Sequence, residues 1–310
     1  MTETTCGEWI ARFLAADPPR SKSLVMTVLG DAIAPHGGAV WLGSLIELVE
    51  PLTVTERLAR TSVFRLVQEG WLNASREGRR SRYALEPASL PRLQRANRRI
   101  YSAPGLGWDG RWTVLLAPNG TLPADLRATL RKELQWEGYA MLSAGVMAHP
   151  SYEPEALDDI LHRNGGDGRL FAFAASTLPD VASRPVPDLV DEGWDLSAVV
   201  ERFQHFVDTF TPLLELLQAG PPADAATAFA IRTLLVHAYR RVLLHDPRLP
   251  LELLPPVWPG TYAYELARAI YLRTWEAAEA HLVAALRRED PAAPSADDAF
   301  YRRFGGLSRA

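Results

Sequence analysis

Arginine is concentrated in one part of the chain, at a density suited to binding a polyanion. Residues 55–99 hold eleven arginines against four glutamates, a net charge of +7, whereas the whole chain of 310 residues carries −4. Guanidinium groups bind phosphates through paired hydrogen bonds as well as charge, so this excess favours a nucleic-acid backbone as the partner. The alternative is a solvated arginine-rich face, because the chain has lysine only at Lys22 and Lys132.

Apolar spacing and helix-ending residues predict the elements that carry these arginines. Three amphipathic helices are followed by two short strands that flank a glycine-containing turn. Thr53 and Thr55 are both acceptable N-caps for the third helix, which runs to Glu69 and stops at Gly70. This order is that of a winged helix-turn-helix. The predicted segments are 21–33, 41–49, the third helix, 71–74 and 81–85.

The third helix has one apolar and one polar face. At 100° per residue Ala59, Val63 and Leu66 point to the core, and the opposite side carries groups that can bind base edges or phosphates. Phe64 is the exception on that side, and it either packs beneath the hairpin or touches a thymine methyl. The hairpin arginines are placed to meet the sugar-phosphate backbone. The predicted DNA contacts are Arg57, Arg60, Thr61, Arg65, Gln68, Arg76, Arg79 and Arg80.

The remainder of the chain is acidic, with a net charge of −5 over residues 104–191 and −3 over 192–310. The order β-α-β-β-α-β in the middle part fits a ferredoxin-like unit, and a proline-rich stretch, 179–193, reads as a linker before a helical region. The expected fold is therefore α+β and multidomain. The expected divisions are an N-terminal extension (1–20), a winged helix-turn-helix (21–103), a ferredoxin-like domain (108–178) and a helical effector and dimerisation domain (194–310).

Motifs of enzymes and metal sites are missing from the sequence. There is no H-E-x-x-H, C-x-x-C, G-x-S-x-G, Walker loop or G-x-G-x-x-G, so we predict no catalytic residue, metal or cofactor. A nuclease would place a carboxylate at the end of the first middle strand, which here reads Leu116-Ala117-Pro118. The only cysteine, Cys6, lies in a terminus expected to be frayed. With neither a membrane span nor a signal peptide, the chain is expected to be soluble and cytoplasmic.

The densest polar cluster of the helical region is on its second helix. His237, Arg240 and Arg241 are spaced i, i+3, i+4 and share one side, where they are suited to a phosphate-bearing or carboxylate ligand. Ion pairing with the acidic middle domain is the alternative.

Several ordered blocks resemble the PaaX-type repressors of phenylacetate-degradation operons, over residues 21 to about 306. The resemblance is carried by Trp41-Leu42-Gly43-Ser44-Leu45-Ile46, Glu56-Arg57-Leu58, Arg60-Thr61-Ser62-Val63-Phe64-Arg65-Leu66, Gly70-Trp71-Leu72, Gly78-Arg79-Arg80-Ser81, Arg98-Arg99-Ile100-Tyr101, Trp108-Asp109-Gly110-Arg111-Trp112, Tyr239-Arg240-Arg241, Asp246-Pro247, Leu249-Pro250 and Trp258-Pro259-Gly260.

The resemblance implies a dimeric winged-helix repressor of double-stranded DNA. Such a protein leaves its palindromic operator when an aryl-acetyl-CoA thioester, typically phenylacetyl-CoA, binds. The family pattern does not say which positions hold the effector. Because CoA offers phosphates and an apolar acyl tail, His237, Arg240, Arg241 and Trp258 are the candidates. The alternative function is a thioesterase-like, acyl-CoA-processing enzyme that carries a DNA-binding module.

Overall fold

The computed structural model describes residues 5–105, 107–151, 153–178, 181 and 184–308. Two compact units emerge from the packing. The first unit comprises residues 1–103, 205–243 and 263–310, and the second comprises 104–204 and 244–262. The N-terminal helices therefore share one unit with most of the C-terminal helices. The division passes through two long helices, α9 (Leu196–Ala219) and α11 (Pro259–Glu289).

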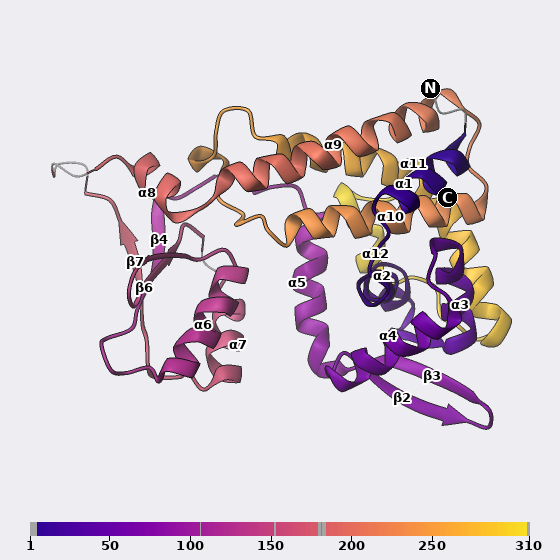
Figure 1. Ribbon diagram of the computed structural model, residues 1–310, viewed down its shortest axis with the longest axis horizontal. Helices are drawn as coiled ribbons and strands as arrows, with labels where there is room; N and C mark the ends of the chain where they lie inside the picture. Colours follow the sequence, from indigo (N-terminus) through magenta and orange to yellow (C-terminus); the bar gives the residue numbers. More distant parts are fainter. Residues whose placement is uncertain (1–4, 106, 152, 179–180, 182–183, 309–310) are drawn as a thin grey trace. The chain divides into compact units, whose positions relative to one another are not determined.

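The N-terminal part of the first unit consists of helices and a small sheet (Figure 1). A π-helical turn, Leu29–Ile33, continues the helix Ser21–Val28, and a short helical turn, Glu50–Leu52, follows the helix Leu42–Val49. The helices are α1 (Cys6–Ala16), α2 (Ser21–Val28), α3 (Leu42–Val49), α4 (Glu56–Gln68) and α5 (Leu90–Tyr101), and the strands are β1 (Ala39–Trp41), β2 (Leu72–Glu77) and β3 (Arg80–Leu85).

Two of these elements differ from the expectation. The terminus around Cys6 is a helix rather than a frayed end, because Thr5 caps it by accepting from the Glu8 amide, and Trp9 is buried. The segment from Ala39 to Trp41 is a strand, so the following helix begins at Leu42. Three residues are too few to show the two-residue period of a strand, so the sequence pattern here is assigned to the helix that follows.

The three-stranded sheet has the order β1-β3-β2 and is antiparallel. Leu72 pairs with Leu85 at the base of the hairpin formed by β2 and β3, and both residues are buried. Beyond that pair the strands of the hairpin are exposed or half-buried. The base of the hairpin is therefore anchored in the core while its tip reaches into solvent.

The second unit contains a four-stranded antiparallel sheet. In chain order its elements are β4 (Arg111–Leu116), α6 (Ala124–Trp136), β5 (Ala140–Ser143), β6 (Val146–His149), α7 (Pro154–Asn164), β7 (Phe171–Ser176) and α8 (Val186–Gly193). The strands lie in the order β5-β6-β4-β7. Helices α6 and α7 cover one face of the sheet through Leu130, Leu134, Leu157 and Ile160, and the other face carries a second cluster around Trp112 and Trp194.

The stretch expected to be a linker is partly helical. Helix α8 packs Val190 into the cluster around Trp112, because its apolar residues fall on one side despite the surrounding proline and acidic residues. The proline-rich connector after residue 248 also joins this cluster through Leu249, Leu253 and Leu254.

The C-terminal helices of the first unit are α10 (Ala225–Leu243), α11 and the short α12 (Asp298–Tyr301). Thirteen of the nineteen residues of α10 are buried, among them Arg232 and His237, so this helix is surrounded by the rest of the unit. In the part of the chain that is described, no helix is long and apolar enough to cross a membrane.

Candidate nucleic-acid interface

The outward face of α4 presents the predicted polar residues to solvent. Thr55 caps the helix by accepting from the Leu58 amide, which settles the choice between the two threonines. Ala59, Val63 and Leu66 are buried as predicted, and Phe64, on the other side, is 60% exposed. The side chains around Phe64 are also exposed: Arg57, Arg60, Thr61, Arg65 and Gln68.

Two of these side chains are held along the helix. Arg60 donates from Nε and Nη2 to Oε1 of Glu56, at 2.8 and 2.6 Å, and the Thr61 hydroxyl donates to the Arg57 carbonyl at 2.9 Å. An exposed pair one turn apart contributes only about 0.3–0.5 kcal/mol, so Arg60 can leave Glu56 for a phosphate at small cost.

The hairpin of β2 and β3 displays a second set of arginines. Glu77 pairs with Arg80, so the loop is the two-residue turn Gly78-Arg79, and Gly78 takes the positive φ (61°) that a type II′ turn requires at its first position. Arg76, Arg79 and Arg80 are all exposed. The turn therefore projects Arg79 from the tip.

Aromatic side chains brace one arginine beside the turn of the hairpin and one at the start of α5. The Arg80 guanidinium lies 4.5 Å from the Trp41 ring centre, and that of Arg92 lies 4.5 Å from the Trp71 ring centre. Stacking fixes each guanidinium plane while leaving its edge for hydrogen bonds. Arg92 begins the basic run on α5 that ends with Arg98 and Arg99.

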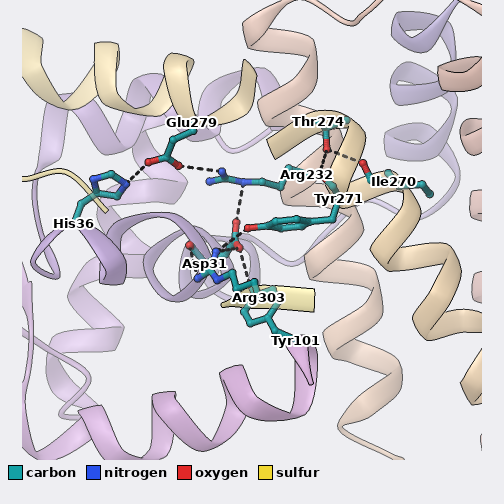
Figure 2. A network of polar contacts seen from close by, with 9 residues as sticks. All are labelled: Asp31, His36, Tyr101, Arg232, Ile270, Tyr271, Thr274, Glu279 and Arg303. Carbon is teal, nitrogen blue, oxygen red and sulfur yellow. Dashed lines mark hydrogen bonds and ion pairs between the residues drawn. The ribbon is translucent and has the colours of Figure 1, made fainter. Parts of the chain in front are cut away.

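A buried polar network ties this surface to the C-terminal helices (Figure 2). Its centre is Asp31, in the π-helical turn after α2, whose Oδ1 accepts from the Tyr101 hydroxyl at 2.5 Å and from Arg303 Nη1 at 3.0 Å. Oδ2 of Asp31 lies 3.1 Å from Arg232 Nε in an ion pair. Asp31, Arg232 and Arg303 are each less than 5% exposed.

The network extends from Arg232 to His36, in the short helical turn Ala34–His36 that follows the turn of Asp31. Arg232 Nη1 lies 3.3 Å from Glu279, and the second oxygen of Glu279 lies 2.6 Å from His36 Nε2. Nδ1 of His36 lies 2.8 Å from the Pro294 carbonyl. The chain of contacts thus joins the segment after α2 to α10, to α11 and to the C-terminal residues.

The opposite charges of the network keep one another ionised, although burial disfavours the charged forms. Burial disfavours the charged guanidinium of Arg232, but Asp31, Tyr271 and Glu279 together outweigh this effect and the pKa of Arg232 is raised. Burial likewise raises the pKa of Tyr271, which accepts from Arg303, to about 12. Each arginine therefore stays charged and each tyrosine stays a hydroxyl donor.

Sequence reasoning missed this network. Asp31 lies inside the run Leu29-Gly30-Asp31-Ala32-Ile33, whose other residues are apolar or glycine, so a helix formed there has no polar face for the carboxylate. A charged residue in such a run was the only local sign of the network. Its partners Tyr101, Arg232 and Arg303 are 70 to 272 residues away along the chain. No local spacing connects them.

The predicted effector residues of α10 face the N-terminal segment. Arg240 Nη2 donates to the Ser23 hydroxyl at 2.9 Å, and Arg241 Nη1 lies 2.7 Å from Asp17 in an exposed ion pair. The expected alternative for these arginines was ion pairing with the acidic middle domain, and their partners are instead in the first unit. Trp258 belongs to the second unit, where it packs edge-on against Phe203.

His237 is buried against Thr27, with Nδ1 3.1 Å from the hydroxyl oxygen. That hydroxyl donates its one proton to the Ser23 carbonyl, so Nδ1 of His237 carries the proton of this hydrogen bond. Burial, with the positive charge of Arg240, lowers the pKa of His237 to about 3.

Replacing His237 by asparagine is expected to make the free energy of unfolding fall less steeply as the pH is lowered. Because the folded pKa lies below the unfolded value of about 6.5, the free energy of unfolding is lowered as the pH falls from about 6.5 towards 3. Asparagine keeps a donor for Thr27 without titrating. In urea titrations the loss between pH 7 and pH 4 should be about 3 kcal/mol smaller in His237→Asn. His149 is also buried with a lowered pKa, but it is present in both proteins, so its effect cancels in the comparison. The same pH dependence of the unfolding free energy in wild type and variant would contradict the prediction.

A pocket of about 150 Å³ lies in the first unit beside the base of the hairpin, lined by Trp41, Arg82, Leu286 and Asp290 among others. A cavity of this volume holds about one benzene ring, whereas sites for drug-sized ligands measure about 300–1,000 Å³. It is too small for a whole acyl-CoA. Within the described ranges, no cluster of histidine, cysteine and carboxylate side chains has the arrangement of a metal site.

Comparison with known proteins gives consistent matches along the chain. Residues 20–88 match a family described as PaaX-like protein, residues 106–186 the central Cas2-like domain of the PaaX protein, and residues 194–284 the C-terminal domain of PaaX-like proteins. Over 301 residues the chain is 36% identical to the transcriptional repressor PaaX of Escherichia coli (strain K12), covering 97% of this chain and 95% of that protein. The solved structure of the uncharacterized protein Rv0674 from Mycobacterium tuberculosis is similar with a TM-score of 0.47 and 26% identity, over 83% of this chain and 98% of that one.

Proposed function

Because the chain belongs to the PaaX family, we propose that it is a transcriptional repressor that binds double-stranded DNA through α4 and the β2–β3 hairpin and controls phenylacetate catabolism. The observation that carries the proposal is the arginine-rich surface itself. Five polar residues of α4 and three arginines of the hairpin are exposed on one module whose apolar helix faces are buried. The family consists of regulators rather than enzymes, which sets aside the acyl-CoA-processing alternative.

The order and pairing of the elements support a winged helix-turn-helix. Helices α2, α3 and α4 precede the hairpin, and β1, between α2 and α3, adds a third strand next to β3. In this fold α4 is the recognition helix and the hairpin is the wing. The sheet order β5-β6-β4-β7 with two helices on one face likewise supports a ferredoxin-like middle domain.

The two groups of side chains have different tasks in this proposal. Arg57, Thr61 and Gln68 on α4 read base edges in the major groove, while Arg79 and Arg80 of the wing contact phosphates. A two-fold dimer places two recognition helices in successive major grooves of a palindromic operator.

The contacts of α10 support release of DNA by an acyl-CoA thioester. A ligand whose phosphates recruit Arg240 and Arg241 draws these guanidinium groups away from Ser23 and Asp17, which lie on α2 and just before it. Helix α2 packs directly on α4, so a shift of α2 moves the DNA-reading face. The ligand then binds the DNA-free form more tightly, and the two equilibria are linked reciprocally.

A mobility-shift assay on the DNA upstream of the protein's own gene tests the proposal, with and without a panel of acyl-CoA thioesters that includes phenylacetyl-CoA. We expect a shifted band that one aryl-acetyl thioester abolishes. A shift that no thioester affects would overturn the effector assignment and leave the DNA-binding assignment standing. Failure to shift that DNA in preference to unrelated DNA would overturn the repressor itself.

Arg241→Ala separates the effector step from DNA binding. Its ion pair with Asp17 is about half exposed, so the variant is expected to fold and to bind DNA as before. The thioester concentration needed for release should rise about tenfold, the loss expected for one charge-assisted phosphate contact of about 1.5 kcal/mol. Arg288→Ala, which removes a similarly exposed arginine paired with Glu47, is the control and should release normally. Identical release in both variants would place the effector elsewhere.

A further inference from the structure

Phe64 is an apolar side chain in the middle of the exposed polar face of α4. We propose that its ring contacts the C5-methyl group of a thymine in the major groove, so that the protein selects a T·A pair at one position in each half of its operator. The inference deepens the proposed function and rests on it, because it names a base that the recognition helix reads and the residue that reads it.

The ring of Phe64 is not part of the core. Its exposed fraction of 60% is the largest of any large apolar side chain that the structure describes in the first unit. This exposure excludes packing beneath the hairpin, which is one of the two interpretations that the sequence allows. Burial of a phenylalanine ring is favourable, so a partner that covers the ring gains that free energy when it binds.

The neighbours of Phe64 on the helix surface are polar or positively charged. At 100° per residue, the side chains nearest to it around the helix axis lie within roughly 60° of it on one face. The exposed side chains around the ring are Arg57, Arg60, Thr61, Arg65 and Gln68. A protein partner that covered the ring would have to bury the arginines of this set or pair them, whereas the phosphates of DNA pair with them directly.

The thymine methyl is the one apolar group that base pairs present in the major groove. The other groups on the base edges there are hydrogen-bond donors or acceptors, and a phenyl ring pressed against one of them would leave it without water and without a partner. Cytosine lacks the methyl group and carries an amino donor where thymine has a carbonyl. Phe64 therefore favours thymine over cytosine at the position that it covers.

Replacing thymine by deoxyuridine tests the contact, because it removes the methyl group and keeps the base pair. Each thymine of the preferred upstream duplex is replaced in turn, and binding of the full chain is measured by fluorescence anisotropy. At one thymine of each half-site the wild type is expected to bind about fourfold more weakly, which is the effect of losing one buried methyl group. Phe64→Ala, which changes an exposed side chain, is expected to fold and to bind the thymine and uracil duplexes equally well.

Leu58→Ala is the matched control for this comparison. Leu58 is also an exposed apolar residue of α4, with an exposed fraction of 42%. It lies roughly 120° from Phe64 around the helix axis and so points away from the ring. This variant is expected to discriminate between thymine and uracil at the same position as the wild type does.

Cytosine methylation supplies a second readout, which adds the methyl group instead of removing it. In a duplex that has a C·G pair at the sensitive position, 5-methylcytosine carries a methyl group on the same ring carbon as thymine. Methylation of that cytosine is expected to strengthen binding of the wild type about fourfold. It is expected to leave binding of Phe64→Ala unchanged.

The outcomes distinguish this contact from the repressor assignment. A wild type that binds the upstream DNA specifically but is insensitive to uracil at every thymine would overturn the contact and leave the repressor standing. A Phe64→Ala variant with the sensitivity of the wild type would also overturn the contact, because another residue or the shape of the groove would then account for it. A wild type that does not distinguish the upstream DNA from unrelated DNA would overturn the repressor and the contact together.

Discussion

Asp31→Ala is expected to lower the free energy of unfolding by about 3–5 kcal/mol, the cost of breaking a buried ion pair on one side. The variant leaves Arg232 and Arg303 buried without the carboxylate that both of them contact, and it removes the acceptor of the Tyr101 hydroxyl. Urea denaturation measures the change through the transition midpoint.

Asp17→Ala is the matched control for this prediction. It also removes an aspartate from an arginine, but both side chains of the Asp17–Arg241 pair are about half exposed. Its expected cost is below about 1 kcal/mol, because solvent screens the pair. Equal losses in the two variants would mean that the buried network does not hold the N-terminal helices to α10 and the C-terminal residues.

The second large effect concerns DNA. Arg57→Ala is expected to weaken binding to the preferred DNA by about 1–3 kcal/mol, or about 5- to 150-fold, and to leave binding to unrelated DNA nearly unchanged. Arg60→Ala is expected at the lower end of this range, because Arg60 must first give up its hydrogen bonds to Glu56. Fluorescence anisotropy with labelled duplexes measures both.

Arg79→Ala should behave differently, since it sits at the tip of the wing. It is expected to weaken binding to all sequences alike and to reduce the slope of log K against log salt by about 1. Arg169→Ala, an exposed arginine of the second unit, is the control and should change neither quantity. A sequence-dependent loss in Arg79→Ala, or a uniform one in Arg57→Ala, would mean that the two sets of residues have been given the wrong tasks.

Local pattern was sufficient for most helices and strands. The apolar stripe of Ala59, Val63 and Leu66 oriented α4 correctly, because a 13-residue helix repeats its buried face several times. The strand at Ala39–Trp41 and the helix at Val186–Gly193 were missed, because the one is too short for its period to be read and the other lies within a proline-rich stretch.

Tertiary partners were beyond reach of the sequence. His237, Arg240 and Arg241 were correctly placed on one side of a helix, but spacing along α10 does not reveal that Ser23, Thr27 and Asp17 face them. The same holds for Asp31 and its two arginines. Contacts across more than 200 residues depend on how the helices of the first unit pack, and neither charge nor period encodes that packing.

Hydrogen exchange with and without bound DNA tests the central claim most directly, namely that α4 and the β2–β3 hairpin form the DNA-binding surface. After the upstream fragment has been bound, protection is expected in peptides covering residues 56–68 and 72–85, and none is expected over α6 and α7, which lie in the acidic stretch 104–191. Protection of α6 and α7 with α4 and the hairpin unchanged would contradict the account.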